Sequence, residues 1–600
     1  MAVPGMLSDA VERSLDIFAG SNAEKPVLQL IRILAFLLYV ATSPSPSLTL
    51  AEFLIGCEAK EDPQDPDILR VLDILKPAIS GEANISLLGE VYENLITHPK
   101  EQGSFYTPRF ITRYIVEKTL DPVVEGLSMS ELKWLKIIDP AMGAGAFVLE
   151  AVEFMTACVL QQAQDERQVY LDEQQAYQDE QQMLQDAVNA ACGCICGADI
   201  DPLAVEAARL SVWVTSGCKF KYSELRYNLR CRDSLLEDWS GQFDAIIGNP
   251  PYLFGERVPE SIQDNRPLFE FAKGQFDVYW LFFELAMRKY LVDGGCHGFI
   301  VPDAILARDE TACIREPISR KWQILNLVQT GPVFGGASVS GAIVVWRKSA
   351  LDGQPDTIET GRFDGTDYTP LEALAQHTLA DLPGCRWLIG INSESMEQLD
   401  WLFANSRPLG TLARISRGEE LGKSALSPHF GEGMVGVLAG DDVIRLGCSR
   451  PSRCVTPETI RKKPVKYVSP KIVLVKTGKT LVASVDLEDT VTLQSIYNIH
   501  VSGCDIWYVC GLLSSELINQ VIGRICTDHK QIFPQLNQST VASIPILIPD
   551  PSDAQGLQMV AAISAAAQEA HSASPGSRVI LKQQIDELLS KGMKHFLNLV

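Results

Sequence analysis

The chain has 600 residues, of which 46% are hydrophobic and 21% charged, and its formal net charge is −23. This composition is that of an ordinary soluble globular protein, and the length predicts roughly three to five domains. The most apolar stretch, residues 28–41, is too short to span a bilayer and contains Arg32, so we expect a buried or interface helix and no membrane contact. Fifteen Cys in no framework spacing and no secretion signal favour reduced thiols in a cytoplasmic protein.

Residues 1–100 carry helical patterns without glycine turns, and apolar residues in 87–95 fall at helical spacing. The sequence therefore predicts a helical N-terminal region. Glu58-Ala59-Lys60 supplies the E-x-K of a nuclease metal site, but the residues upstream lack the Pro-Asp partner that such sites use. We predict no restriction activity for this chain, although a separate partner could cut.

From about residue 134 the sequence changes to short apolar runs separated by helical patterns. The runs are WLKIIDP, CICGADIDP, FDAIIGNPPY, GFIVPDAIL and AIVVWRK. Such alternation predicts an α/β fold, with a mostly parallel sheet and helices on both faces.

Polar residues and glycines follow several of these strands. Asp139, Gly143 and Gly145 stand between the first strand and a helix, where glycines let a ligand approach the backbone. G-x-G without a third glycine fits a nucleoside ligand lacking a pyrophosphate better than NAD. Asp199 ends the next strand, where a carboxylate can accept hydrogen bonds from ribose hydroxyls, and Asp233 ends a third, where it could bond an adenine amino group.

Between these motifs lies a polar, acidic, Gln-rich stretch, residues 165–186, that predicts a solvated helix. Cys192, Cys194 and Cys196 follow it. On a strand, these alternate positions would place three sulfurs on one face, but a zinc site usually has CxxC pairs and a matched fourth ligand. We therefore predict small buried side chains and no metal.

Residues 244–252, DAIIGNPPY, form an apolar run that stops on Gly248, an amide, two prolines and an aromatic ring. Because proline cannot donate to a sheet ladder, the strand must end there. In open α/β sheets, ligands bind at the carboxyl ends of strands. The alternatives for this segment are a Pro-rich turn that caps a core strand and a catalytic turn.

The second half of the chain has a different pattern. Residues 351–404 are expected to be a linker, with LDGQPD and RFDGTDYTP as loops, and 405–550 a mixed, β-rich domain followed by a helical segment, 551–600. Residues 410–480 hold thirteen Lys or Arg against six Asp or Glu, a local charge of +7 that leaves about −30 for the remaining chain. A basic island in an acidic chain favours a polyanionic partner.

Taken together, the motifs resemble the gamma-class amino-methyltransferases of DNA, which transfer a methyl group from S-adenosylmethionine to an exocyclic amine, usually N6 of adenine. The resemblance covers about 85–550 and rests on GSFYTP, DPAMGAGAF, GADIDP, RDSLL, NPPY, GGCHGFIVPDAIL and VFGGASVSGAIVVW in this order. Residues 405–550 are similar to the specificity domain of these enzymes. Met142, where the family often has a smaller residue, and the long span from Gly145 to Asp199 are departures; we interpret the span as an insertion.

The resemblance implies a Rossmann-like methyltransferase domain over 101–350, a target-recognition domain over 405–550, and roles for individual residues. Tyr106, Thr107 and Pro108 would close over the methionine end of the cofactor. Asp139, Ala141 and Gly143 would form its loop, Asp199 would hold the ribose and Asp233 the adenine. The expected catalytic residues are Asn249, Pro250, Pro251, Tyr252 and Phe334, with Phe334 as a second aromatic at the target base.

The amine of adenine is a poor nucleophile because its lone pair is delocalised into the ring. The side-chain oxygen of Asn249 and the backbone carbonyl of Pro250 can accept its hydrogens and direct the lone pair at the methyl group. Tyr252 would stack on a base that has left the duplex. The basic residues expected to contact phosphates are Arg461, Lys462, Lys463, Lys466 and Lys471.

Several alternatives stay open at the level of the sequence. NPPY also occurs in enzymes that methylate glutamine side chains or RNA amines, and N4 of cytosine is another possible target. A non-catalytic DNA-binding subunit of a defence complex could keep a methyltransferase shell. The prediction is a sequence-specific adenine methyltransferase acting on double-stranded DNA, in a restriction–modification or phage-defence system with or without separate subunits.

Overall fold

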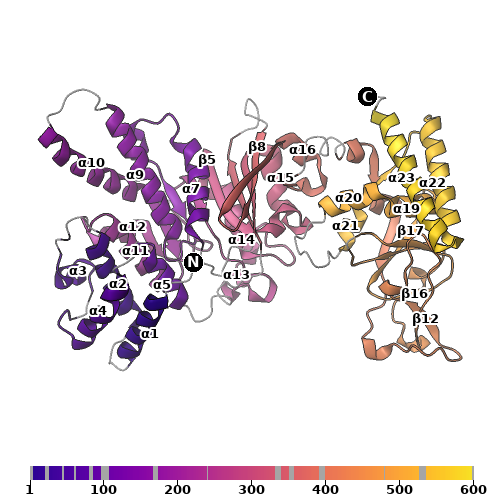
Figure 1. Cartoon of the computed structure of the whole chain (residues 1–600), viewed down its shortest axis with the longest axis horizontal. Helices are drawn as coiled ribbons and strands as arrows, with labels where there is room; N and C mark the ends of the chain where they lie inside the picture. Colours follow the sequence, from indigo (N-terminus) through magenta and orange to yellow (C-terminus); the bar gives the residue numbers. More distant parts are fainter. Residues whose placement is uncertain are drawn as a thin grey trace. The chain divides into compact units, whose positions relative to one another are not determined.

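The computed structural model describes residues 5–19, 26–42, 46, 48–59, 62–79, 85–95, 107–166, 173–219, 221–239, 241–331, 340–349, 357–390, 399, 401–478, 480–525 and 536–597. The chain divides into two compact units, which are described separately (Figure 1). Unit 1 comprises Met1–Ile305 and Cys313–His377, and unit 2 comprises Leu306–Ala312 and Thr378–Val600.

Unit 1 begins with helices, as predicted for residues 1–100. They are α1 (Gly5–Ala19), α2 (Pro26–Thr42), α3 (Leu50–Gly56), α4 (Pro66–Ile79) and α5 (Leu87–Leu95). The apolar stretch at residues 28–41 lies in α2 and is largely buried, which confirms the interpretation as a buried helix. These helices pack on α11 (Pro202–Thr215): Phe53 contacts Trp213 with ring centroids 5.0 Å apart, and Arg32 pairs with Glu206 at 3.0 Å.

A nine-stranded sheet forms the centre of unit 1, in the order β3-β2-β1-β4-β5-β7-β6-β8-β9. The first five strands in this order, from β3 to β5, run parallel to one another. Strand β7 is antiparallel to both β5 and β6, and β8 is parallel to β6. The fold prediction of a mostly parallel sheet is confirmed. The strands are β1 (Ile137–Asp139), β2 (Ile195–Asp199), β3 (Leu229–Cys231), β4 (Phe243–Gly248), β5 (Leu291–Pro302), β6 (Gln323–Thr330), β7 (Gly341–Arg347), β8 (Thr357–Asp364) and β9 (Asp367–Ala375).

Helices cover both faces of this sheet, as two neighbouring residues of β5 illustrate. A Cβ on Gly298 would lie 1.9 Å from the hydroxyl of Thr119, so α7 (Arg109–Val124) packs directly on one face. The adjacent His297 faces α14 (Val278–Leu285), its ring 4.7 Å from that of Phe283. Because successive side chains of a strand point to opposite faces, α7 and α14 lie on opposite sides of the sheet. The remaining helices of unit 1 include α8 (Met129–Leu132), α12 (Leu225–Asn228), α13 (Glu260–Asp264) and α15 (Ala312–Lys321).

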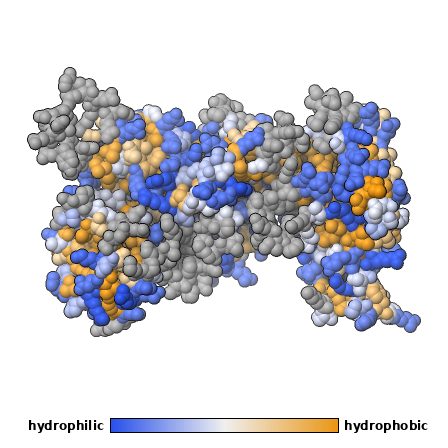
Figure 2. Space-filling view, viewed as in Figure 1, coloured by the Kyte–Doolittle hydropathy of each residue, from blue (hydrophilic) through white to orange (hydrophobic). Residues whose placement is uncertain are grey.

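The span between the first two strands is filled by two paired helices, α9 (Ala146–Glu166) and α10 (Glu173–Cys194). Residues 146–163 of α9 are long and apolar enough to cross a membrane, but 56% of this window is buried inside the protein. Since α9 also contacts α7, β1 and β2, it is a core helix of the unit. In Figure 2 the visible face of each unit carries hydrophilic and apolar residues interspersed.

Two details of local structure differ from the sequence analysis. Cys192 and Cys194 end α10 and only Cys196 lies in β2, so the three sulfurs do not line one strand face, but Cys192 and Cys194 are buried and Cys196 is partly buried, in agreement with the prediction of small buried side chains. Part of the expected linker 351–404 also belongs to the sheet, because residues 357–375 form the β8–β9 hairpin. Asp364 and Asp367 pair at its end, so Gly365 and Thr366 form the two-residue turn, with Gly365 at φ 65°. A glycine with positive φ permits the tight turn that joins two strands.

Unit 2 is mixed and β-rich in its middle part, as predicted. A four-stranded sheet has the order β11-β17-β14-β15, a three-stranded sheet β13-β12-β16, and a two-stranded sheet β10-β18. The bounds are β10 (Ser406–Pro408), β11 (Ala413–Arg417), β12 (Val435–Leu438), β13 (Arg453–Val455), β14 (Lys471–Val475), β15 (Ala483–Asp486), β16 (Val491–Thr492), β17 (Ile496–Val501) and β18 (Pro545–Leu547).

Helices complete unit 2 at its C-terminal side. Asp505 and Asp553 accept backbone N–H bonds at the amino ends of α19 and α22, which explains where these helices begin. The predicted C-terminal helical segment corresponds to the pair α22 and α23, and α22 packs against α19. The helices are α16 (Gln376–Asp381), α18 (Leu409–Leu412), α19 (Ile506–Ser514), α20 (Glu516–Ile525), α21 (Gln538–Ala542), α22 (Ala554–Ser572) and α23 (Pro575–Leu597).

Candidate functional site

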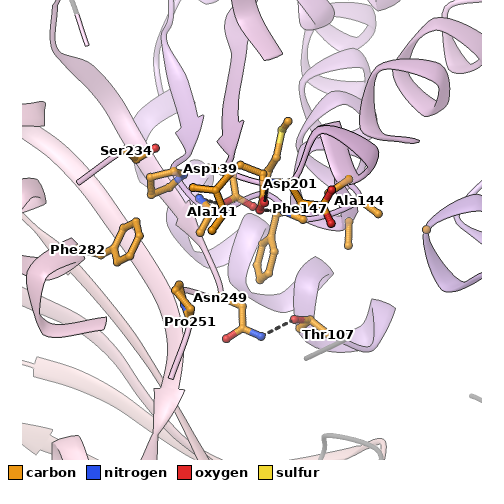
Figure 3. A pocket seen from close by; sticks show the side chains of 18 of the residues that line it. Thr107, Asp139, Ala141, Ala144, Phe147, Asp201, Ser234, Asn249, Pro251 and Phe282 are labelled. Atoms are coloured by element: carbon orange, nitrogen blue, oxygen red, sulfur yellow. Dashed lines mark hydrogen bonds between the residues drawn. The ribbon is translucent and has the colours of Figure 1, made fainter. Parts of the chain in front are cut away.

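A cavity of about 700 Å³ opens at the carboxyl ends of β1, β2 and β4 in unit 1 (Figure 3). This is the edge of an open α/β sheet at which ligands bind. Most of the predicted site residues among the described part of unit 1 line the cavity: Thr107, Asp139, Ala141, Gly143, Asp199, Asp233, Asn249 and Pro251. Motifs that are up to about 140 residues apart in the chain therefore meet at one place.

The loop from β1 to α9 forms one wall of the cavity. Asp139 accepts a hydrogen bond from the N–H of Ala141 at 3.0 Å, which turns the chain after the strand. Gly143 and Gly145 have φ values of 52° and 90°, which favour glycine. A Cβ on Gly145 would lie 2.9 Å from the Cβ of Ala208, so this glycine also allows α9 to start close to α11.

Asp199 joins the ends of β1 and β2. Its carboxylate accepts the N–H of Gly143 at 2.9 Å and the N–H of Asp201 at 2.9 Å. It thus holds the glycine loop in place, and its predicted role toward a ribose stays a prediction. Asp201 caps α11 through the N–H of Leu203, and its second oxygen accepts the hydroxyl of Tyr92 at 2.5 Å.

Asp139 has the most strongly altered acidity in the cavity. Burial raises the pKa of Asp139 to about 8, the N–H of Ala141 opposes this rise, and the charge of Asp199 adds to it. The Oδ2 atom of Asp139 is buried and has no hydrogen-bond partner among the described residues. A buried carboxyl oxygen without a partner is available to pair with a bound group. Burial also raises the pKa of Asp199.

Asp233 follows β3 and lines the same cavity. Its Oδ1 accepts the N–H of Leu235 at 2.9 Å, which forms a short turn beside Ser234. The same oxygen accepts the N–H of Leu236 at 3.4 Å, so both bonds of this turn use Oδ1 and the carboxylate retains acceptor capacity toward the cavity. Its predicted contact with an adenine stays a prediction.

Asn249 directly follows β4, as the sequence predicts for the end of this strand. Its amide nitrogen donates to the hydroxyl of Thr107 at 3.0 Å (Figure 3). Its amide oxygen accepts the hydroxyl of Tyr252 at 2.5 Å. The Tyr252 hydroxyl also lies 3.1 Å from the backbone oxygen of Ile300 in β5. Both ends of the Asn249 amide are therefore hydrogen-bonded.

Other predicted residues lie outside the cavity wall. Pro108 stands at the amino end of α7, and Pro250 does not line the cavity. Tyr252 is 7% exposed and packs against Tyr279 with ring centroids 6.1 Å apart, so little of its ring is open for stacking in this structure. Tyr106 and Phe334 lie outside the described residues.

Several residues that line the cavity were not identified from the sequence. Arg109 pairs with Glu150 at 3.2 Å and with Glu153 at 2.5 Å, which ties the start of α7 to α9. Ile200 is 71% exposed at the cavity wall, and Phe282 of α14 faces the cavity in Figure 3. The sequence did contain one signal for this region: Asp201-Pro202 is typical of a helix start, and α11 begins there, next to the cavity.

For one of the five residues predicted to bind phosphate in unit 2, the prediction is wrong. Lys471 is fully buried and donates to Asp486 at 2.6 Å and to the backbone oxygen of Tyr467 at 2.7 Å. Its charge serves an internal ion pair, so it does not reach a phosphate. Lys462 is partly buried and donates to the backbone oxygens of Arg417 and Gly418.

The other three basic residues keep the exposure that a phosphate contact needs. Arg461 and Lys463 are exposed, and Lys466 is partly exposed. The segment that carries them is held by buried Glu419, which accepts the backbone N–H of Lys462 at 2.7 Å and the hydroxyl of Tyr467 at 2.9 Å.

In the part of the chain that the structure describes, the cysteine cluster and the E-x-K triplet form no metal site. Among the described residues, no group of three or more His, Cys, Asp or Glu side chains could hold a metal ion. Glu58, the acidic residue of the E-x-K triplet, pairs with Arg226 at 2.6 Å, and Lys60 lies outside the described residues.

Two family comparisons match separate parts of the chain. Residues 193–334 match the Eco57I restriction-modification methylase family, and residues 436–546 match the TaqI-like C-terminal specificity domain. The chain combines an Eco57I-like methylase domain with a TaqI-like specificity domain. Both matches agree with the methyltransferase and specificity domains that the motifs in the sequence implied.

Individual proteins agree with these domain matches. The type II methyltransferase M.TthHB8I of Thermus thermophilus is 25% identical over 53% of this chain and 75% of its own length. RM.Eco57I of Escherichia coli is 24% identical over 41% of this chain and 29% of its own length. The adenine-specific methyltransferase PglX of Streptomyces coelicolor is 25% identical over 46% of this chain and 26% of its own length. The chain thus spans under a third of the two longer relatives.

A solved structure extends the likeness to the fold of nearly the whole chain. The type IIL restriction-modification enzyme MmeI, solved in complex with DNA, superposes with a TM-score of 0.56 at 13% identity, over 97% of this chain and 96% of that chain. At this identity the likeness concerns the fold.

Proposed function

We propose that the protein is a sequence-specific DNA methyltransferase that transfers a methyl group from S-adenosylmethionine to N6 of an adenine extruded from the duplex. The observation that carries the proposal is that Asn249, at the carboxyl end of β4, shares one cavity with the glycine loop after β1. A nucleoside-binding loop and an amide acceptor on one cavity are the two parts that an amine methyltransferase requires.

The cavity fits the cofactor in size and chemistry. A volume of about 700 Å³ lies within the range of cofactor sites. Asp139, Asp199, Asp201 and Asp233 supply acceptors for the amino and hydroxyl groups of a cationic nucleoside, and Asp139 Oδ2 is buried without a partner among the described residues. When bound, S-adenosylmethionine supplies a methyl group on a sulfonium, which is already a strong donor.

The protein's contribution to the chemistry is positioning. The side-chain oxygen of Asn249, which accepts the Tyr252 hydroxyl in this structure, has two lone pairs and can also accept a hydrogen of the target amine. The backbone carbonyl of Pro250 stays the predicted acceptor of the second hydrogen, although Pro250 does not line the cavity in this structure. Two acceptors of this kind favour the amine as it becomes tetrahedral, and holding the reactants in line supplies most of the rate acceleration.

We propose that the specificity domain recognises the DNA sequence. Arg461, Lys463 and Lys466 would contact phosphates, which fix the protein on the duplex without reading its bases. The likeness to restriction–modification enzymes favours a bacterial-type defence role in the cytoplasm, with or without separate restriction subunits. Adenine is favoured over cytosine N4 because a relative of this chain, PglX, is named as adenine-specific.

The test is to incubate the purified chain with S-adenosylmethionine and unmethylated genomic DNA and to digest the product to nucleosides for mass spectrometry. We expect N6-methyladenine in one short sequence context, and none with Asn249→Ala. N4-methylcytosine as the sole product would contradict the choice of base. Methylation of RNA or protein but not DNA would contradict the substrate, and DNA binding without methylation would favour a non-catalytic DNA-binding subunit.

A further inference from the structure

The proposed chemistry requires the Asn249 amide to keep one orientation about its terminal torsion. Rotation about the sp³–sp² bond of an Asn side chain has a broad energy profile, so the side chain alone does not fix its amide plane. We propose that the hydroxyl of Thr107 is a positioning group that holds the Asn249 amide plane, with the Tyr252 hydroxyl at the opposite end. This inference rests on the proposed function, because it assigns a role to Thr107 in that reaction.

The contacts on the two ends of the amide carry the inference. The Nδ2 atom of Asn249 lies 3.0 Å from Thr107 Oγ1, and its Oδ1 atom lies 2.5 Å from the Tyr252 hydroxyl. Thr107 is 5% exposed and Tyr252 7% exposed, so water competes little for either bond. Hydrogen bonds at both ends of a planar group restrict its rotation far more than one bond does.

Thr107 can act as a fixed point because its own segment is anchored. Pro108 sets the backbone at the amino end of α7, with φ −56° and ψ 144°. The next residue, Arg109, pairs with Glu150 and Glu153 of α9, and the Glu150 side chain is 8% exposed. Since α9 starts directly after the glycine loop, Thr107 links this loop to Asn249 through rigid elements.

The opposite contact is anchored in the sheet. The Tyr252 hydroxyl lies 3.1 Å from the backbone oxygen of Ile300 in β5, and its ring packs against Tyr279 of α14. The buried Tyr252 ring therefore acts, in this structure, as a support for Asn249. This arrangement separates two effects of Tyr252, since Tyr252→Phe removes the hydroxyl and retains the ring.

The experiment compares variants that differ by a single hydroxyl. Thr107→Val has nearly the shape of threonine but leaves Asn249 Nδ2 without this acceptor, and Thr107→Ser keeps the hydroxyl. We expect Thr107→Val to lower kcat on DNA at least tenfold, with the Kd for S-adenosylmethionine and the KM for DNA within twofold. We expect Thr107→Ser to retain most of the turnover and Tyr252→Phe to resemble Thr107→Val.

Thr119→Val is the matched control. Thr119 lies on α7, is fully buried, does not line the cavity, and its hydroxyl has no hydrogen-bond partner among the described residues. The same substitution there should leave kcat unchanged. Isothermal titration of S-adenosylmethionine and fluorescence of 2-aminopurine at the target base then report cofactor binding and base extrusion independently of turnover.

The outcomes distinguish this inference from the proposed function. Wild-type turnover of Thr107→Val beside an inactive Asn249→Ala would overturn the role of Thr107 alone. A loss of cofactor affinity in Thr107→Val that Thr107→Ser restores would overturn it in favour of a direct contact with the cofactor. Absence of methyl transfer by the wild type would overturn the proposed function and this inference with it.

Discussion

Asp139 is a buried carboxyl in a cavity that we assign to a cationic cofactor. Its raised pKa, about 8, means that it is largely protonated at pH 7 in the free protein. A bound cation favours the ionised carboxylate, so binding of the cation below pH 8 must release a proton. Asp199 on β2 is the charged group that adds to the shift, and it accepts backbone bonds in the same loop.

We therefore predict that the affinity for S-adenosylmethionine rises with pH up to about 8 and then levels off. Titration calorimetry at pH 6.5 and 8.5, in two buffers of different ionisation enthalpy, measures both the affinity and the released protons. Asp139→Asn cannot ionise and should bind with a weaker dependence on pH. An equally steep dependence in Asp139→Asn would assign the released proton to another group.

At the level of single residues, the sequence predicted the cavity well because its motifs end strands of one parallel sheet. The side chains of such residues meet at one edge whatever their distance along the chain, as Asp139 and Asn249 do. Burial of a charge was not predictable: Lys471 stands in a basic segment but points inward to Asp486. Nor was the contact of Tyr92 with Asp201, which joins residues 109 positions apart without any local pattern.

Among the elements, β5 contains an unusual core residue, His297. Both ring nitrogens are buried without a hydrogen-bond partner among the described residues, and the ring lies among Phe283, Phe299 and Trp346. Burial lowers the pKa of His297 to about 3. The unfolded chain binds a proton at this residue below about pH 6.5, while the folded protein does not, so stability falls as the pH decreases from 6.5 towards 3.

We predict that His297→Phe is more stable than the wild type at low pH. At pH 5 the wild type should lose ~2 kcal/mol of unfolding free energy relative to pH 7.5 through this residue, a loss that the variant avoids. Urea unfolding at both pH values measures the difference between the two proteins. The exposed His377 provides the control, since His377→Phe should not change this difference.

The predicted elements agree with the structure where hydrophobic period and length are both clear. The strand of residues 243–248 ends before Pro250, as the missing proline donor requires. The wrong predictions concern segments whose local sequence pattern fits two kinds of secondary structure. The alternating cysteines around the start of β2 also suit the last turn of a helix. Residues 362–370 were interpreted as a loop, although Asp364-Gly365 is a hairpin signal in the sequence.

For the molecule as a whole, the main feature is the uneven distribution of charge. The net charge of −23 repels DNA at long range, so the proposed DNA binding requires the positive residues of the specificity domain. Arg461 and Lys463 are exposed, whereas Lys471 is neutralised within the fold. Fewer basic side chains are therefore available to DNA at the surface than the number of Lys and Arg residues in the sequence indicates.

Reversal of the two exposed charges, Arg461→Glu with Lys463→Glu, is predicted to weaken DNA binding about tenfold or more and to reduce the slope of log K against log salt by about 2. Fluorescence anisotropy at several salt concentrations measures both. Arg70→Glu with Lys76→Glu in α4 changes the net charge equally and reverses two exposed residues of unit 1. Equal effects of the two double variants would mean that net charge, and not this surface, governs binding.

The β8–β9 hairpin determines where the catalytic half of the chain can be cut. A fragment ending at residue 350 would leave the backbone of β6 unpaired along one side and would uncover the rings of Phe110 and Tyr114 on α7, which pack against Phe363 of the hairpin. An open strand edge next to exposed aromatic rings favours self-association. A fragment extended to residue 390 keeps the hairpin and also retains Arg386, which pairs with Asp309 at 2.7 Å. The useful boundary for expression thus lies about forty residues beyond the last catalytic motif in the sequence.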